Sequence, residues 1–366
     1  MTKITIVTIS LVSFVILSAT LANVLVSSAS YTPTITIVSS GMVLQSVPAV
    51  NAAVHKALFS WGGVPSSYVD HIAQFDWDYL GPEDAQLIPS IRAENPKIII
   101  IGYFDVIVGD ANISYPETCY MHNASGNRIY FAPQESSRNP TPFMNISDPT
   151  WQSICINSTK EQVAQGFDGV MADDTWSNYF QMYGSTTDPA PSGAWWNSYD
   201  SGANYTRWQT AMRTLLAGMQ AAIGANKIVC CNGGSSVYYD VCAAANLEDF
   251  VFGGGADAMT WINILEAIST VEKYVIAHSG SMADNETNYI FGLSCYMLGM
   301  NGTNTYFSGS NIWHPSMGIY PSIINRDFGK PLGSKVQVSA NVWTREFENC
   351  TVTADFSSQT GQIVMK

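Results

Sequence analysis

Two adjacent carboxylates, Asp173 and Asp174, close a short apolar stretch that begins at Gly166. The stretch reads Gly-Phe-Asp-Gly-Val-Met-Ala, and a short apolar run bounded by glycine is typical of a buried strand. Strands that are buried on both faces belong to parallel sheets. A carboxylate at the end of such a strand could act as a nucleophile, a base or a proton donor. The alternative is that one of the two caps the next helix or turns the chain, roles that suit Asp.

The elements that must position these carboxylates alternate between strand and helix. We expect strands at residues 75–80, 97–103, 143–146, 166–174, 227–234, 250–252 and 289–296. We expect helices at residues 82–93, 148–165, 207–222, 238–246 and 262–278. Residues 31–50 form either a linker or a first strand. This alternation predicts an α/β protein with a parallel sheet. Seven or eight repeats without a Gly-x-Gly-x-x-Gly motif or a P-loop favour a closed, TIM-like (β/α)8 barrel, whose chemistry sits at the C-terminal strand ends.

The two ends of the chain differ from this middle part. Residues 1–29 carry a single charge and contain a long apolar run, which predicts a secretory signal or an uncleaved N-terminal anchor. Residues 30–334 are expected to form the barrel. Residues 335–366 alternate polar and apolar side chains and contain turn residues, which predicts a final strand and a small antiparallel β hairpin.

Export is supported by sequons for N-glycosylation, so we expect an extracellular or cell-surface glycoprotein. The sequons begin at Asn112, Asn123, Asn145, Asn157, Asn204, Asn285, Asn301 and Asn349. The chain has seven cysteines and no Cys-x-x-Cys motif. In an exported protein we expect some of them to pair as disulfides, although the connectivity cannot be deduced.

Composition limits the partners of this chain of 366 residues. The formal net charge is −13, which argues against nucleic acid and against an anionic membrane surface as partners. Membrane contact is expected only through the N-terminal segment. The five histidines are scattered and no Cys/His spacing matches a metal site, so we expect neither a metal nor a cofactor.

The pattern Gly-Phe-Asp-Gly-Val-x-x-Asp-Asp resembles that of exported (β/α)8-barrel glycoside hydrolases from families of uncharacterised activity. The passage Gly-Lys-Pro at residues 329–331, followed by Trp-Thr-Arg-Glu-Phe-Glu-Asn at residues 343–349, strengthens the resemblance. The resemblance covers residues 75–366 and implies a barrel that acts on a polysaccharide or oligosaccharide. The chain departs from the pattern at Cys350, where glycine is usual.

Hydrolysis of a glycosidic bond needs two carboxyl groups, one to donate a proton and one to act as nucleophile or base. The resemblance places the nucleophile or base at Asp173, with Asp174 beside it. It also implies a carboxylate at the end of the sixth strand, where residues 253–255 are all glycine. We therefore expect Asp257, the nearest carboxylate after these glycines, to be the proton donor.

Aromatic residues crowd the long loop after Asp174, and flat rings match the C–H faces of pyranoses. We expect Trp176, Tyr179, Trp195 and Trp196 to bind substrate, although such rings also pack loops onto a barrel. Asp105 and Asn232, near the ends of two other expected strands, complete the substrate-binding set.

Two alternatives stay open: a catalytically inactive carbohydrate-binding protein and a cell-surface structural protein on the same barrel.

Overall fold

The structure is a computed structural model that describes most of the chain beyond residue 53. The described ranges are 54–60, 62–122, 126–130, 141–175, 206–232, 235–252, 257–269, 273–279, 285–301, 304–309 and 322–366. The chain divides into two units, Met1–Val38 and Ser39–Lys366, and every described residue belongs to the second unit.

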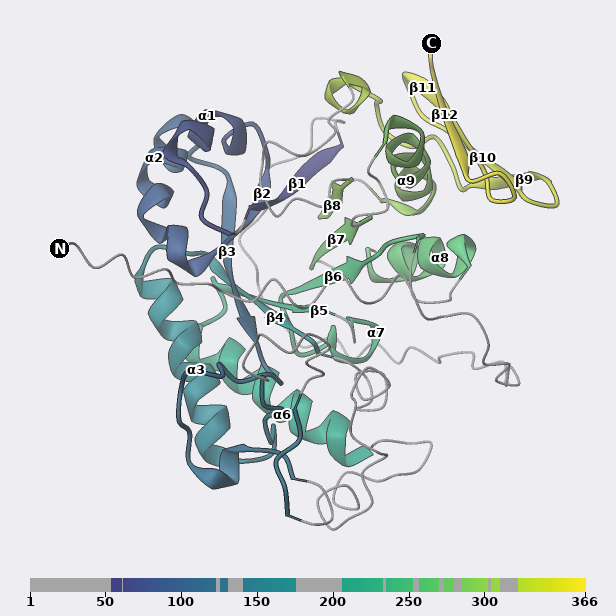
Figure 1. The fold of residues 1–366 in the computed structure, drawn as a ribbon. Helices are drawn as coiled ribbons and strands as arrows, with labels where there is room; N and C mark the ends of the chain where they lie inside the picture. Colours follow the sequence, from purple (N-terminus) through teal and green to yellow (C-terminus); the bar gives the residue numbers. More distant parts are fainter. Residues whose placement is uncertain are drawn as a thin grey trace. The chain divides into compact units, whose positions relative to one another are not determined.

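Eight parallel strands close into a barrel in chain order, which confirms the predicted fold (Figure 1). The strands are β1 (His55–Ser60), β2 (Trp77–Leu80), β3 (Ile99–Asp105), β4 (Gly169–Asp173), β5 (Ile228–Asn232), β6 (Ala244–Glu248), β7 (Tyr274–His278) and β8 (Thr305–Ser308). Pairing of β1 with both β2 and β8 completes the ring, so the barrel has no free sheet edge.

Helices connect the strands and cover the outside of the barrel (Figure 1). The α-helices are α1 (Val69–Ile72), α2 (Ile88–Glu94), α3 (Pro149–Ala164), α6 (Thr206–Ile223), α7 (Ser235–Tyr238), α8 (Ala258–Ile268) and α9 (Glu286–Gly299). Short 3-10 helices are η1 (Ser66–Tyr68), η2 (Pro82–Leu87), η3 (Glu117–Cys119) and η6 (Ser322–Asn325). Within the described ranges, no helix is both long enough and apolar enough to cross a membrane.

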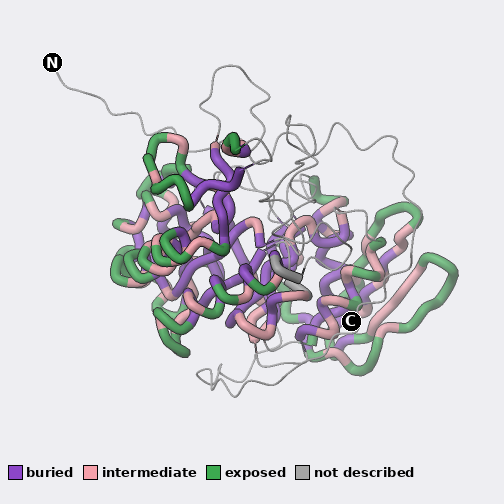
Figure 2. The backbone as a smooth tube through the Cα atoms, turned by 90° about the horizontal axis from the view of Figure 1, so that it is seen from below, coloured by how far each residue is buried: buried purple, intermediate pink, exposed green. Residues whose placement is uncertain are grey.

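The inside of the barrel is filled by side chains from alternate strand positions. Figure 2 shows buried stretches of the backbone in the middle, with exposed stretches around them. The ring of Phe59 stacks between Tyr79 and His278, with centroid distances of 4.0 and 3.8 Å. Trp77 is fully buried in the same interior cluster. Because both faces of each strand are covered, the strands read as continuous apolar runs.

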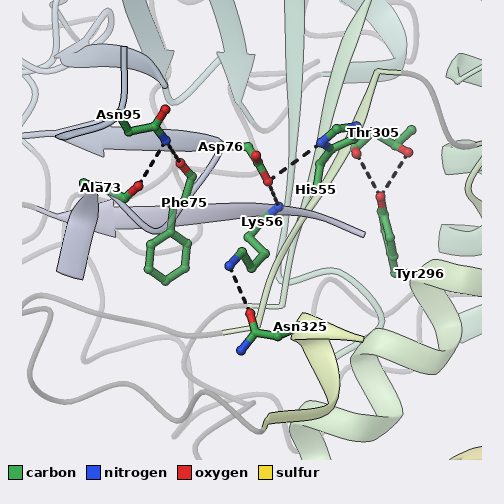
Figure 3. Close-up of polar contacts among 9 residues, drawn as sticks. All are labelled: His55, Lys56, Ala73, Phe75, Asp76, Asn95, Tyr296, Thr305 and Asn325. Atoms are coloured by element: carbon green, nitrogen blue, oxygen red, sulfur yellow. Dashed lines mark hydrogen bonds and ion pairs between the residues drawn. The ribbon is translucent and has the colours of Figure 1, made fainter. Parts of the chain in front are cut away.

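Polar contacts join the N-terminal ends of β1 and β2, as Figure 3 shows. The Asp76 carboxylate accepts a hydrogen bond of 2.8 Å from the Lys56 backbone amide and lies 3.7 Å from His55 Nδ1. The Lys56 ammonium donates to Asn325 Oδ1 at 3.0 Å (Figure 3). Asp76 therefore holds the end of the barrel opposite to the C-terminal strand ends, which is a structural role.

Four antiparallel strands form a separate sheet at the C-terminus, which confirms the predicted β extension and enlarges it. The strands are β9 (Val336–Ser339), β10 (Val342–Glu346), β11 (Cys350–Asp355) and β12 (Thr360–Met365), in the order β12-β11-β10-β9. Alternate residues of β11 are buried, and β11 and β12 pack against α9. The Arg345 guanidinium donates to the carbonyls of Met297, Leu298 and Met300, which closes the C-terminal end of α9.

Several predicted elements are wrong in position or type. The first strand is β1. It lies after residues 31–50, which were expected as a linker or first strand, and before residues 75–80, which were expected as the next strand. Residues 143–146 make only isolated bridges and are not a barrel strand. The sixth strand is β6, in place of the helix expected at residues 238–246 and the strand at 250–252.

Two further errors concern the end of the barrel. The segment expected as one helix over residues 262–278 covers the last part of α8 and the whole of β7. The segment expected as a seventh strand, residues 289–296, lies inside α9, and the eighth strand is β8. Nearly all of α9 is buried between the barrel and the C-terminal sheet, so its sequence is apolar on every side and lacks helical periodicity.

The expected disulfides are not found. All seven cysteines lie in described segments, and each is a buried free thiol: Cys119, Cys155, Cys230, Cys231, Cys242, Cys295 and Cys350. Six of them belong to one hydrophobic cluster and Cys230 belongs to the barrel interior. Among such apolar side chains a free cysteine behaves as a small apolar residue.

Candidate active site

Four polar side chains gather at the C-terminal ends of neighbouring strands. Asp105, Asp173, Asn232 and Glu248 are the last residues of β3, β4, β5 and β6. Register pairs Asp105 with Asp173, and Asn232 with Asn246, which lies two positions before Glu248 on β6. Because side chains alternate along a strand, residues two apart point the same way, and these ends converge at the barrel mouth.

Asn232 connects two carboxyl groups through a single nitrogen atom. Its Nδ2 donates to Asp173 Oδ1 at 2.6 Å and to Glu248 Oε2 at 2.7 Å. Two oxygens bound to one nitrogen at these distances are at most about 5.3 Å apart. The amide is itself oriented by Asn246, whose Nδ2 donates to Asn232 Oδ1 at 3.0 Å. Asn232 and Asn246 are both buried, so this bridge is part of the rigid barrel.

Asp173 is surrounded by hydrogen-bond donors. Its Oδ1 accepts from Asn232 and from the Asp174 backbone amide at 2.8 Å, and its Oδ2 accepts from the Tyr103 hydroxyl at 2.8 Å. Burial and the nearby carboxylates Asp173 and Asp105 raise the pKa of Tyr103 well above its usual value, so the phenol keeps its proton and donates it. Three donors hold the carboxylate in one orientation at the barrel mouth.

Glu248 has the opposite environment. Burial, followed by the negative charges of Asp173 and Asp249, raises the pKa of Glu248 well above its usual range, and the hydrogen bond from Asn232 opposes this only in part. Glu248 therefore tends to keep a proton at a pH at which an ordinary Glu has lost it. Because Oε2 accepts from Asn232, the proton belongs on Oε1. The raised pKa suits Glu248 to donate a proton beside Asp173.

Asp105 and Asp174 form a second carboxyl pair beside Asp173. Asp105 Oδ1 accepts from the backbone amides of Ile107 and Val108, both at 2.9 Å. Burial, followed by the charges of Asp174 and Asp173, raises the pKa of Asp105 well above its usual value, and its side chain hydrogen-bonds that of Asp174. Asp174 adopts a left-handed φ of 57°, which Asp tolerates better than most residues. This turn directs Asp174 to the site, where a continued strand would have pointed it away.

Glu248 is the functional candidate that sequence reasoning missed. The sixth strand was expected to end in glycines 253–255, without a side chain able to act, but β6 ends at Glu248. A signal was present, because the acidic pair Glu248 and Asp249 follows an apolar segment as Asp173 and Asp174 do. Alanine-rich residues before it favour a helix by intrinsic propensity, which concealed the strand.

The other expected site residues fall outside this cluster. Asp257 precedes α8, and its Oδ1 caps the helix by accepting from the Thr260 backbone amide at 2.7 Å. No contact described for Asp257 reaches Asp173 or Glu248. Trp176, Tyr179, Trp195 and Trp196 lie outside the described residues, as do glycines 253–255.

Comparison with solved structures supports the barrel. A trehalulose synthase mutant in complex with Tris is similar at a TM-score of 0.51 and 9% identity, covering 84% of this chain and 91% of that chain. An alpha-galactosidase from Thermus thermophilus has a TM-score of 0.50 at 9% identity, covering 86% of this chain and 68% of that chain. The glycoside hydrolase domain of PelA from Pseudomonas aeruginosa has a TM-score of 0.45 at 14% identity, covering 69% of this chain and 94% of that chain. At these identities the likeness to the first two structures shows the fold alone.

Sequence comparison identifies the family. A comparison with curated proteins found no match. Residues 92–351, which are 260 of the 366 residues, match the family described as "Hypothetical glycosyl hydrolase family 15". The match extends from α2 to the beginning of the C-terminal strand β11 and contains both bridged carboxyl groups. The chain therefore belongs to hypothetical glycosyl hydrolase family 15.

Proposed function

We propose that this protein is a secreted, retaining glycoside hydrolase of a polysaccharide or oligosaccharide, with Asp173 as nucleophile and Glu248 as general acid and base. The observation that carries the proposal is the Asn232 bridge, which brings one oxygen of each carboxyl group within about 5.3 Å of the other. Retaining glycosidases hold their two carboxyl groups about 5–5.5 Å apart, whereas inverting ones need about 6.5–9.5 Å to admit a water.

The first step forms a covalent intermediate. An Asp173 oxygen attacks the anomeric carbon as the bond from that carbon to the glycosidic oxygen breaks, and Glu248 Oε1 gives its proton to the departing oxygen. Two observations support these roles: three hydrogen bonds hold Asp173 in place, and burial and carboxylate neighbours raise the pKa of Glu248. The leaving alcohol departs neutral.

The second step returns the enzyme to its starting state. Glu248, now a carboxylate, takes a proton from a water molecule while that water attacks the anomeric carbon and displaces Asp173. Asn232 and Tyr103 keep Asp173 in position through both steps. Two inversions at the same carbon produce net retention of configuration.

Variants of the two carboxyl groups test the proposal on a panel of aryl glycosides and oligosaccharides. Asp173→Asn should abolish turnover. Glu248→Gln should preserve kcat/KM for substrates with good leaving groups and lower their kcat, because the second step loses its base. Glu161→Gln, on the exposed face of α3, is the matched control. Added azide should restore turnover by trapping a glycosyl azide, inverted for Asp173→Asn and retained for Glu248→Gln. Full activity of Asp173→Asn, or a wild-type product of inverted configuration by NMR, would refute this mechanism.

The alternative of an inactive carbohydrate-binding or structural protein depended on a missing carboxylate at the sixth strand. Glu248 supplies a carboxyl group at the end of the sixth strand, so the enzyme is the better supported proposal. Wild type that binds members of the panel and turns over none would favour the alternative.

Secretion rests on the sequence of residues 1–29 and on the sequons. Mass spectrometry of the natural product should show a chain that begins near Ser30 outside the cytoplasm, or an intact apolar segment in a membrane fraction. A cytoplasmic chain that retains Met1 would contradict both.

A further inference from the structure

A cavity of about 660 Å³ lies where the barrel meets the C-terminal sheet. Its walls come from the loop after β6, the beginning of α8, the N-terminal half of α9, and the sheet. The volume lies within the ~300–1,000 Å³ of small-molecule sites. No residue of the carboxyl cluster lines it, so it is separate from the candidate active site.

Aromatic rings form one part of the wall. Phe252, Phe291 and Phe356 pack edge to face, with centroid distances of 5.6 Å between the first two and 6.5 Å between the last two. Trp343 of β10 lines the cavity and is partly exposed. A partly exposed indole beside fixed phenyl rings offers a flat apolar face of the kind that matches the C–H face of a pyranose.

Polar side chains complete the lining. Gln337, Asn341 and Gln359 are exposed carboxamides that line the cavity, and Gln337 Nε2 donates to the Ala340 carbonyl at 3.0 Å, which orients its amide. Asp257 also lines the cavity, and the helix cap occupies its Oδ1, so Oδ2 is the oxygen that can serve a ligand. Carboxamides donate and accept at once, as vicinal hydroxyl groups require. Among the described residues that line the cavity there is no Lys or Arg, which disfavours an anionic ligand.

We propose that this cavity is a second carbohydrate-binding site that holds a neutral segment of the same glycan that is cut at Asp173 and Glu248. The identity of the ligand rests on the proposed function, whereas the site itself rests on its lining. The loop between the two sites is short, because Val251 in the cavity wall follows Glu248 by three residues. Val251 adopts a left-handed φ of 63°, an outlier for a β-branched residue, so packing holds this loop in one shape.

Affinity electrophoresis tests the site without catalysis. The parent protein is Asp173→Asn, and the gels contain hydroxyethylcellulose, glycol chitin, soluble starch or galactomannan. At least one gel should retard the parent. Trp343→Ala should weaken the apparent affinity about tenfold, as expected for loss of an aromatic anchor, and Trp343→Phe should keep part of it. Replacing both Gln337 and Asn341 by Ala should weaken it without touching the core, because both are exposed.

Gln362→Ala is the matched control for the glutamine change, because Gln362 lies on the other face of the sheet. Its neighbour Gly361 faces α9, where an added Cβ would lie 2.5 Å from the Ile290 carbonyl oxygen. Successive residues of a strand point to opposite faces, so Gln362 points away from α9. The control should migrate as the parent does.

In the active protein, Trp343→Ala should lower kcat/KM for the polymer more than for short aryl glycosides. Equal retardation of Trp343→Ala and the parent, or retardation in none of the gels, would overturn the second site. A third outcome would be that anilinonaphthalene sulfonate binds only when Trp343 is present, while no gel retards the parent. That result would assign the cavity to an apolar ligand and would also overturn the second carbohydrate site. Turnover of aryl glycosides by the wild type still tests the proposed function by itself.

Discussion

Replacement of Glu248 by Gln should separate proton donation from substrate binding. The amide has the shape of the acid, and its carbonyl oxygen can still accept the hydrogen bond that Asn232 Nδ2 makes at 2.7 Å. It cannot give a proton to the glycosidic oxygen. General acid catalysis contributes about 10²–10⁴-fold, or roughly 2.7–5.5 kcal/mol of activation free energy. We expect kcat/KM to fall by about that factor for leaving groups that need protonation, and far less for dinitrophenyl glycosides.

The pH profile should change as well. In the wild type, activity should fall on the alkaline side as Glu248 loses its proton, and the raised pKa of Glu248 places this limb above the ordinary Glu range. Glu248→Gln should lack this limb.

Stability provides an independent readout of the same pKa. Since the folded state holds a proton that the unfolded chain releases, the wild type should lose stability as the pH rises from about 4.3, the ordinary pKa of Glu, to the raised pKa of Glu248. The slope is at most about 1.4 kcal/mol per pH unit. Glu248→Gln lacks this loss, so its advantage over the wild type should grow with pH in that window. Asp105 titrates in both proteins and cancels in the difference.

Steady-state kinetics across pH and urea denaturation at matched pH values measure these effects. Glu161→Gln should behave as the wild type in every assay. Asp257→Asn, which removes the donor expected from sequence, should keep the alkaline limb. The assignment of Glu248 would be wrong if Glu248→Gln slowed good and poor leaving groups equally and its stability difference from the wild type did not depend on pH.

Three further outcomes are expected. Asn232→Ala should lower kcat and move the alkaline limb to higher pH, because the hydrogen bond from Asn232 lowers the pKa of Glu248. A limb that does not move in the pH–rate profile would argue against the Asn232 bridge. Alkylation of the unfolded protein without reductant should label all seven cysteines, and reductant should leave the melting temperature unchanged; fewer labels would reveal a disulfide. Gly169→Ala should lower the free energy of unfolding in urea by about 3 kcal/mol or more, because the added Cβ would lie 1.8 Å from the Ile228 carbonyl oxygen. Gly333→Ala is the control and should leave stability unchanged, because a Cβ there meets open space.

Local sequence was enough for the elements whose patterns are unambiguous. The apolar runs that became β3, β4 and β5 were predicted because both faces of each strand are buried. The helix α3 was predicted with Asp148 at its start, and the Asp148 carboxylate accepts from the backbone amides of Thr150 and Trp151 as an N-cap. Asp105, Asp173 and Asn232 were correctly placed near strand ends for this reason.

Local sequence failed where long-range pairing or packing determined the structure. The strand β6 reads Ala-Ala-Asn-Leu-Glu, which has no β-branched residue, and its extended form depends on pairing with β5 and β7. The helix α9 carries residues common in strands, but its burial against β11 and β12 made that composition uninformative. His55 and Lys56 begin β1 with polar residues, and pairing with β2 and β8 makes them part of the barrel.

By itself the sequence determined that the chain is an α/β barrel with a β extension and that a carboxylate pair ends its fourth strand. The reason is that a buried strand appears as a short apolar run, and the residues at its end follow directly in the sequence. Only the tertiary structure decided which second carboxyl group meets Asp173. Glu248 is 75 positions away along the chain, and ring closure through β5 and β6 brings it to the same Asn232 nitrogen. The closeness of Asp173 and Glu248 follows from the register of the strands. That register depends on contacts among all eight strands and cannot be read from any single strand.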